Sequence, residues 1–385
     1  MKITQSDAIE EGMRERFFLF GPPLAPHQRQ LAAVENDFLR KFDLIYQLAQ
    51  KIRSRSGLRL NTQCSHSASR CAIPVSNEKN MIRALLEFDT RLFSRTFNLH
   101  SINPVLRALI DCDQETLERR RSWSGNLGSN DFPKKMIDEM NQEFSTQKTT
   151  LADRAVRREE ANYLHRSNQD QREMSKFLER RFYNEQILCG MRINLGYPNL
   201  SANGEPLPSG MRLEEVNHHR IQLFQYLDND FVPSPVGLVV KLEHSHGMGY
   251  GYHCLLLFTA RQGADLVAIA EQVGKYWTQV ATQGKGVYYR WQSEGAGKMI
   301  PGVGRILCAD ELVPVVRYFF RLDRYMTLAP TRTLFKRPVG QDRKKTTKAP
   351  TNTRATVSGE PAGYGGAGTG RRVGRPPGTH RRPSC

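Results

Sequence analysis

The sequence predicts an α+β fold in which an antiparallel sheet follows a helical N-terminal region and precedes a disordered basic tail. Three observations lead to this prediction. Up to about residue 180 the chain is polar and helical in pattern, and from about residue 187 short apolar strands alternate with helices. The last segment is dense in Gly, Pro, Thr and Arg. We therefore expect helices in 1–180, a mixed domain in 181–340 and a disordered tail in 341–385.

The N-terminal region shows helical periodicity in two places. Apolar residues recur near helical spacing in 78–100, at Ile82, Leu85, Leu86, Leu92 and Phe93. Residues 152–186 form a charged stretch of mixed sign. A helical packing module and a DNA-contacting module both fit these patterns, and a solvated charged face is the simplest interpretation. The role of this region is not evident from its residues.

The mixed domain alternates apolar strands with amphipathic helices. Strands are predicted at 187–195, 235–244 and 251–258, and helices at 211–230, 264–282 and 311–326. The order strand, helix, strand, strand, helix, helix is typical of an antiparallel sheet with helices on one side.

Basic charge is concentrated at the C-terminal end of the chain. The net charge is +17, and residues 331–385 carry 13 Lys/Arg against 2 Asp/Glu, a net of 13 − 2 = +11. Such a segment cannot bury enough apolar surface to order itself, and it attracts polyanions. VGRPPG at 374–379 vaguely resembles minor-groove hooks, but a solvated linker that binds phosphate without reading sequence is the preferred interpretation. The residues expected to contact DNA are Lys344, Lys345, Arg371, Arg372 and Arg375.

Composition argues for a cytoplasmic protein that does not enter a membrane. The chain has no apolar run near the roughly 20 residues of a membrane span, and its first residues lack the apolar core of about 7–15 residues that a secretory signal needs. The seven cysteines are scattered without a CxxC pair, which indicates free thiols in a reducing compartment. CSHSASRC at 64–71 approaches a zinc pattern but lacks a second ligand pair.

The segment HSHGMGYG at 244–251 connects two predicted strands and suits a hairpin turn. A hairpin would bring Glu243, His244 and His246 close to His253. One carboxylate with imidazole nitrogens is a ligand set that Mg²⁺, Mn²⁺ or Zn²⁺ accepts. A lone histidine at a strand edge is more often a hydrogen-bonded structural residue than a metal ligand, and both interpretations remain open at this point.

The segment RYFFRLDRY at 317–325 lies in the last predicted helix. Helical spacing places Tyr318, Arg321 and Tyr325 on one face, at i, i+3 and i+7. A tyrosine can attack a phosphate as a nucleophile when a cation balances the developing charge. Aromatic core packing beside an arginine with its charged end in solvent explains the same residues without chemistry.

Five segments together resemble a known family. They are MRINLGYP (191–198), VVKLEHSHGMGYGYHCLLLF (239–258), GKYWTQVATQGKGVYY (274–289), GVGRI (302–306) and RYFFRLDRYM (317–326). In this order and spacing they resemble the YagK/YfjJ C-terminal domain family, the inovirus gene-two-type replication proteins. The resemblance covers roughly residues 180–340.

The resemblance implies a rolling-circle replication initiator similar to HUH endonucleases. Such enzymes carry a five-stranded antiparallel sheet, a metal-binding histidine pair on a central strand and a catalytic tyrosine on a nearby helix. The second metal histidine corresponds to His253, and the tyrosine motif corresponds to Tyr318 with Arg321, Asp323 and Tyr325. Gly251 stands where the first histidine is expected, and Arg321 stands in place of a lysine.

The sequence therefore leads to a first hypothesis with an explicit site. Tyr318, Arg321 and Tyr325 would be catalytic, and a divalent Mg²⁺ or Mn²⁺ ion would be held by His253, Glu243 and His246. The partners would be single-stranded or supercoiled origin DNA and host replication proteins of a phage or prophage. A second hypothesis is a non-catalytic DNA-binding prophage protein with a degraded metal site. A third is a partner-binding role for the N-terminal helices.

Overall fold

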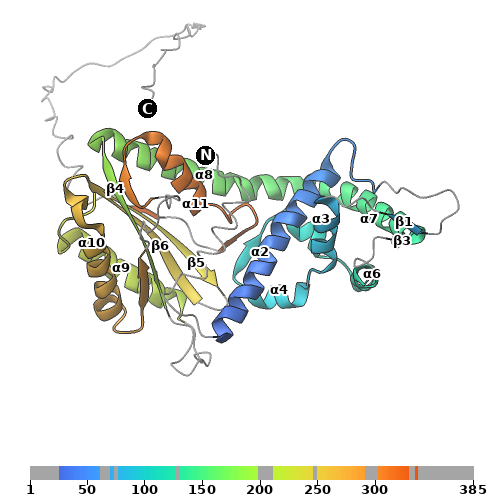
Figure 1. The fold of residues 1–385 in the computed structure, drawn as a ribbon, viewed down its shortest axis with the longest axis horizontal. Helices are drawn as coiled ribbons and strands as arrows, with labels where there is room; N and C mark the ends of the chain where they lie inside the picture. The colour runs from blue at the N-terminus through green and yellow to red at the C-terminus, as the bar shows by residue number, and fades with distance from the viewer. Residues whose placement is uncertain are drawn as a thin grey trace, which may run out of the picture. The chain divides into compact units, whose positions relative to one another are not determined.

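A computed structural model describes residues 26–60, 70–72, 77–125, 131–197, 211–245, 249–290, 302–328 and 334–336 (Figure 1). These residues belong to one compact unit, Met1–Pro338. The expected tail at 341–385 lies outside the described residues.

Helices precede the main sheet, as the periodicity predicts. Their bounds are α2 (Pro26–Arg53), α3 (Asn77–Leu86), α4 (Thr90–Thr96), α5 (Pro104–Ile110), α6 (Gln114–Ser124), α7 (Lys134–Ala152) and α8 (Arg154–Glu185). Side-chain oxygens of Asp89, Asn103, Asp113 and Asp153 accept backbone N–H groups at the starts of α4, α5, α6 and α8. These caps satisfy donors that a helix leaves without partners, so the helix starts are encoded locally.

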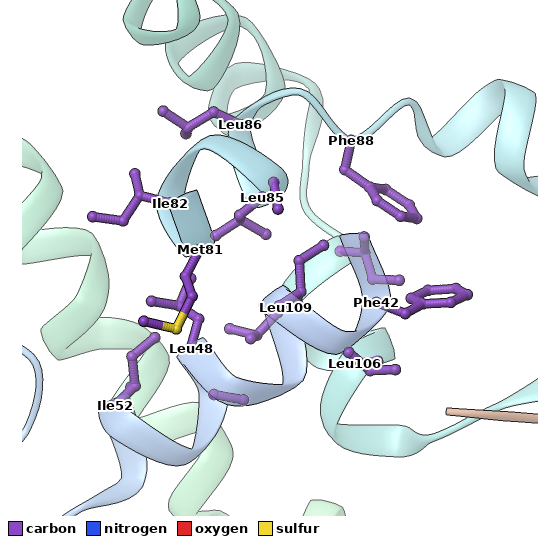
Figure 2. Close-up of a cluster of buried hydrophobic side chains, with 14 of the residues drawn as sticks. Phe42, Leu48, Ile52, Met81, Ile82, Leu85, Leu86, Phe88, Leu106 and Leu109 are labelled. Atoms are coloured by element: carbon purple, nitrogen blue, oxygen red, sulfur yellow. The ribbon is translucent and has the colours of Figure 1, made fainter. Parts of the chain in front are cut away.

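The core of the helical region is built around α2. Its buried apolar residues recur at steps of three and four, as a helix packed on one face requires. Figure 2 shows part of this core, with Phe42, Leu48 and Ile52 of α2 near residues of α3 and α5. The other labelled side chains are Met81, Ile82, Leu85, Leu86, Phe88, Leu106 and Leu109. Phe42 and Phe93 meet edge to face with ring centroids 5.2 Å apart.

Two short sheets connect distant parts of the chain. Strand β1 (Arg70–Ala72) pairs with β3 (Asp131–Pro133), and β2 (His100–Ile102) pairs with β9 (Met326–Leu328), both antiparallel. The second pairing brings residues after the last helix into the helical core, where Tyr325 is buried. Helix α8 spans the boundary expected near residue 180 and packs on α5, α7 and α11. The helical region and the main sheet therefore share packed side chains.

The main sheet is antiparallel, in agreement with the predicted α+β class. Its order is β10-β5-β6-β4-β7, with β8 paired to β4 outside this path. The strands are β4 (Leu188–Gly196), β5 (Gly237–Ser245), β6 (Gly249–Thr259), β7 (Val287–Arg290), β8 (Gly304–Ile306) and β10 (Leu334–Lys336). Strands β4, β5 and β6 match the three predicted strands. The predicted hairpin is formed, since β5 and β6 pair from Ser245 opposite Gly249 onward.

Helices cover both faces of this sheet, so the expectation of helices on one side is wrong. Helices α9 (Leu213–Asn229) and α10 (Leu266–Tyr276), with the π-helical turn Trp277–Ala281, pack on one face. Helix α8 and helix α11 (Leu312–Phe319) pack on the other (Figure 1). All nine residues of β4 are buried. A strand buried on both faces reads as a continuous apolar run, whereas an alternation of apolar and polar residues would indicate one exposed face.

The last predicted helix is shorter than expected. A 3-10 turn at Ala309–Glu311 leads into α11, which ends at Phe319 rather than at residue 326. The Lys241 ammonium group donates to the Phe319 carbonyl oxygen at 2.5 Å, and an Arg321 guanidinium nitrogen donates to the Tyr318 carbonyl oxygen at 2.8 Å. Side-chain donors thus take carbonyls that a further helical turn would use. Hence the predicted face of Tyr318, Arg321 and Tyr325 is not formed.

Within the described ranges, no helix combines the length and the apolar character needed to cross a bilayer.

Candidate functional site

Polar side chains gather at one end of the sheet face that α11 covers. Arg192 and Asn194 of β4, Lys241 and Glu243 of β5, and His253 of β6 lie on this face. The pairing register aligns Asn194, His253 and Lys241 in one row across three strands. Because side chains alternate between the faces of a strand, the same strands also supply the apolar residues that α9 and α10 cover. All five polar side chains are at most 12% exposed.

His253 is held by two neighbouring side chains. Its Nδ1 lies 2.8 Å from Oδ1 of Asn194, and its Nε2 lies 2.9 Å from Oε2 of Glu243. Burial lowers the pKa of His253, while Glu243 acts in the opposite direction. The predicted approach of Glu243 to His253 across the hairpin is confirmed.

The proton on the ring can be assigned from these contacts. A neutral imidazole has one donor nitrogen and one acceptor nitrogen. An oxygen lies at each ring nitrogen of His253, and the acceptor nitrogen cannot bond to an oxygen that also only accepts. Asn194 Nδ2 is buried and has no hydrogen-bond partner among the described residues. Turning the amide places Nδ2–H against Nδ1 and removes the conflict. We infer a neutral His253 whose Nε2–H donates to Glu243.

Tyr318 lies next to this histidine. The two rings meet edge to face, with centroids 6.5 Å apart. The guanidinium carbons of Arg192 and Arg321 lie 3.7 Å and 4.1 Å from the centroid of the Tyr318 ring. Two cations against one aromatic ring are attracted by its π electrons and stabilise negative charge on its oxygen. Tyr318 and Arg321 are thus brought to His253, as the first hypothesis requires.

Lys241 ties the tyrosine helix to the sheet. Its ammonium nitrogen lies 2.5 Å from Oδ1 of Asp323, in addition to the bond to the Phe319 carbonyl, and 3.8 Å from Oε1 of Glu243. Burial raises the pKa of Asp323, and Lys241 opposes this effect. The cluster therefore places three cationic side chains beside two carboxyl groups in a buried setting, with one cation in excess.

Tyr325 is not brought to this cluster. Its hydroxyl donates to Oδ1 of Asp43 at 2.6 Å, and its ring packs edge to face on Tyr46 of α2. Burial, with the Asp43 carboxylate adding to it, raises the pKa of Tyr325. Tyr325 belongs to the helical core, because the chain leaves the helix at Phe319 and turns toward β9.

Of the three residues expected to hold a Mg²⁺ or Mn²⁺ ion, His253 and Glu243 lie side by side. His253 Nε2 and Glu243 Oε2 are 2.9 Å apart, the length of the hydrogen bond between them, so a metal would bind there by displacing the Nε2 proton. Glu243 lies opposite Gly251 in the pairing register, so it occupies the position beside the missing histidine. No group of three or more His, Cys, Asp or Glu residues suited to a metal occurs within the described ranges. His246 lies outside the described residues.

Three residues of the cluster were not singled out from the sequence, namely Arg192, Asn194 and Lys241. The signal that could have found them is polar residues at alternate positions of apolar strands, in MRINL and VVKLE.

The tail residues expected to contact DNA lie outside the described part of the chain, namely Lys344, Lys345, Arg371, Arg372 and Arg375. A cavity of about 200 Å³ lies elsewhere, between the α3–α4 connection and α6, and it contains none of the cluster residues.

The chain was compared with protein families, curated proteins and solved structures. No model of a known protein family, no curated protein and no solved structure matches this chain.

Proposed function

We propose that this protein is a DNA nicking and joining endonuclease with Tyr318 as its nucleophile. It would initiate rolling-circle replication of a filamentous phage, a prophage or a related element in the cytoplasm. The observation that carries the proposal is the position of Tyr318, edge to face on His253 and against the guanidinium groups of Arg192 and Arg321. His253 lies on β6, the middle strand of the order β10-β5-β6-β4-β7. This placement supports the resemblance to the YagK/YfjJ C-terminal domain family.

The chemistry is a transesterification. The Tyr318 oxygen attacks a DNA phosphorus, the phenolic proton passes to solvent, and the bond from phosphorus to the 3′ oxygen breaks. The products are a 5′-phosphotyrosyl link and a 3′-hydroxyl that takes up a proton and primes synthesis. Arg192 and Arg321 stabilise the negative charge on the phenolate and on the phosphorane. The reverse reaction joins the strand without an external energy source.

A divalent cation fits this scheme at His253 and Glu243. When bound there it would polarise the scissile phosphate, with water, a phosphate oxygen or His246 as further ligands. Arg321 retains a positive charge but cannot donate a proton at neutral pH, so its role is electrostatic. The basic tail and host replication proteins would be the further partners at the origin.

The test is a covalent adduct with labelled single-stranded origin DNA in the presence of Mn²⁺. We expect wild-type protein to form the adduct and Tyr318→Phe to form none, while Tyr325→Phe forms it as wild type does. An adduct that persists in Tyr318→Phe would exclude this residue as the nucleophile.

A second candidate is a DNA-binding protein without nicking activity. Two observations favour it: Tyr318 is only 6% exposed, and both ring nitrogens of His253 already contact side chains. In this case DNA binding weakens with salt, a chelator leaves it unchanged, and no adduct forms under any metal condition. Binding that collapses when the divalent ion is removed would count against this candidate.

A further inference from the structure

The longest described helix carries a basic stripe that no step of the proposed reaction uses. On α8 six exposed basic residues follow one another at steps of 4, 7, 7, 4 and 4 residues, and the exposed Arg157 and Arg166 lie to either side of this row. With about 3.6 residues per turn, these steps keep the six residues on one side of the helix over about 39 Å. The stripe consists of Arg154, Arg158, His165, Arg172, Lys176 and Arg180.

The stripe faces away from the protein core. The buried residues of α8 include Met174, Phe177 and Leu178, which lie on the opposite side of the helix by the same periodicity. Phe177 and Leu178 share a packed cluster with the residues of α11. The C-terminal half of the stripe is therefore on the outer side of the same turns that pack against the tyrosine helix.

The charges of the stripe are not neutralised by described neighbours. The ion pairs that α8 makes run through Glu159 and Glu160, to Arg107 and Arg53. None of the six stripe residues forms an ion pair with another described residue. Glu173 borders the stripe and accepts a hydrogen bond from Gln169, and the exposed Glu179 lies on the same side of the helix as Arg172 and Lys176. Five exposed Arg and Lys side chains without ion-pair partners among the described residues, in one row on a single helix, favour a linear polyanion as the partner.

The side chains between the cations identify which polyanion fits. Asn162 and Gln169 stand within the stripe and can donate hydrogen bonds to phosphate and sugar oxygens. One exposed aromatic side chain, Tyr183, follows the stripe at its C-terminal end, whereas single-strand binders stack successive bases on several aromatic side chains. It has no exposed Leu, Ile or Phe beside it, which a helix lying in a lipid surface needs.

We propose that the α8 stripe binds the phosphate backbone of duplex nucleic acid, independently of base sequence. The choice of DNA as the duplex rests on the proposed function. A length of about 39 Å spans roughly one turn of B-DNA. Since α8 packs on α11, a duplex on the outer side of α8 is held one helix away from the element that carries Tyr318. The stripe thus keeps the flanking duplex in place while another segment is presented to the tyrosine.

The test compares two triple variants of the full chain by binding to a 20-base-pair duplex of unrelated sequence, without divalent ions. One combines Arg158→Gln, Arg172→Gln and Lys176→Gln. The control combines Arg121→Gln, Lys134→Gln and Arg261→Gln, which are exposed residues on other elements. We expect the stripe variant to bind roughly tenfold more weakly or worse, with a slope of log K against log[salt] smaller by about 2 to 3, from three lost phosphate contacts. The control should change affinity less than about twofold.

Equal losses in the two variants would mean that only net charge matters, and no loss in the stripe variant would remove the contact altogether. Either result overturns the proposal. Parallel titrations with duplex RNA, single-stranded DNA and anionic vesicles show which of these polyanions binds to the stripe. A stripe-dependent loss with both duplexes supports backbone binding, whereas a loss confined to single strands or vesicles contradicts it. Adduct formation on single-stranded DNA is measured separately, so a failed stripe and a failed nuclease are distinguishable.

Discussion

The rings of His253 and Tyr318 meet nearly at right angles, with centroids 6.5 Å apart. His253 comes from the middle of the sheet and Tyr318 from the last turn of α11. The contact depends on Lys241, which joins the neighbouring strand to the end of this helix. The position of the tyrosine is therefore set by the same sheet face that holds the histidine.

Lys241→Met should strongly destabilise the protein. It leaves the Asp323 carboxylate without its closest cation and the Phe319 carbonyl without its donor, both in a buried setting. Breaking a buried ion pair by removing one partner costs about 3–5 kcal/mol. The free energy of unfolding in urea measures this loss. The matched control is Lys135→Met, whose ion pair with Glu139 is exposed and long, so it should cost less than about 1 kcal/mol. Similar losses in both variants would show that Lys241 does not hold the helix.

The tautomer of His253 is a second prediction. At pH 7 we expect a proton on Nε2 and none on Nδ1, because Glu243 accepts from Nε2–H and Asn194 donates to Nδ1. Long-range ¹H–¹⁵N spectra of the ¹⁵N-labelled ring distinguish the two nitrogens by chemical shift. Asn194→Asp, which cannot donate when ionised, should move the proton to Nδ1 or add one there. A wild-type ring protonated on both nitrogens would contradict the inferred amide orientation.

Much of the sheet domain could be predicted from local patterns. The strands at 187–195, 235–244 and 251–258 and the helices at 211–230 and 264–282 all correspond to elements of the structure. Local composition was sufficient because each is a short apolar or amphipathic run between turn residues. The short strands β7, β8 and β10 were not predicted. Three or four residues carry no readable period, and their pairing depends on partners far away in sequence.

The site was predicted only in part, for a similar reason. The contact between Glu243 and His253 could be predicted because a hairpin fixes which residues face each other across a short turn. Tyr325 could not be separated from Tyr318, because the helix ends at a contact with Lys241 that no helical pattern contains. Arg192 reaches Tyr318 through the register between strands and the packing of α11, which sequence spacing does not specify.

Gly190 should tolerate no side chain. A Cβ atom there would lie 2.6 Å from the Gly302 carbonyl oxygen, which is backbone and cannot rotate away. Gly190→Ala is expected to cost about 1–3 kcal/mol of unfolding free energy, by analogy with overpacked cores. Gly125→Ala is the control, since its Cβ would meet nothing closer than 3.8 Å and its φ of −58° suits alanine. Thermal unfolding compares the two, and equal melting temperatures would refute the close approach of Gly302.

His219 should make stability depend on pH. It is buried against Tyr197, with 2.9 Å between the hydroxyl oxygen and Nδ1, and burial lowers the pKa of His219 while Glu215 opposes this. The unfolded chain, with a pKa of about 6.5, then binds a proton before the folded one does. Stability from neutral His219 is present above about pH 6.5 and is lost as the pH falls below it. The difference in unfolding free energy between wild type and His219→Asn should shrink from pH 7.5 to 5.5. A difference that grows over this range would contradict the lowered pKa.

The measurement that tests the central claim most directly is the location of the DNA adduct. Trypsin cuts after Arg317, Arg321 and Arg324, so the two candidate tyrosines fall in separate peptides, Tyr318–Arg321 and Tyr325–Arg332. After reaction with origin DNA and nuclease trimming, mass spectrometry should find the nucleotide on the Tyr318–Arg321 peptide. A nucleotide on the Tyr325–Arg332 peptide, or no nucleotide on either peptide after efficient nicking, would contradict the proposed role of Tyr318.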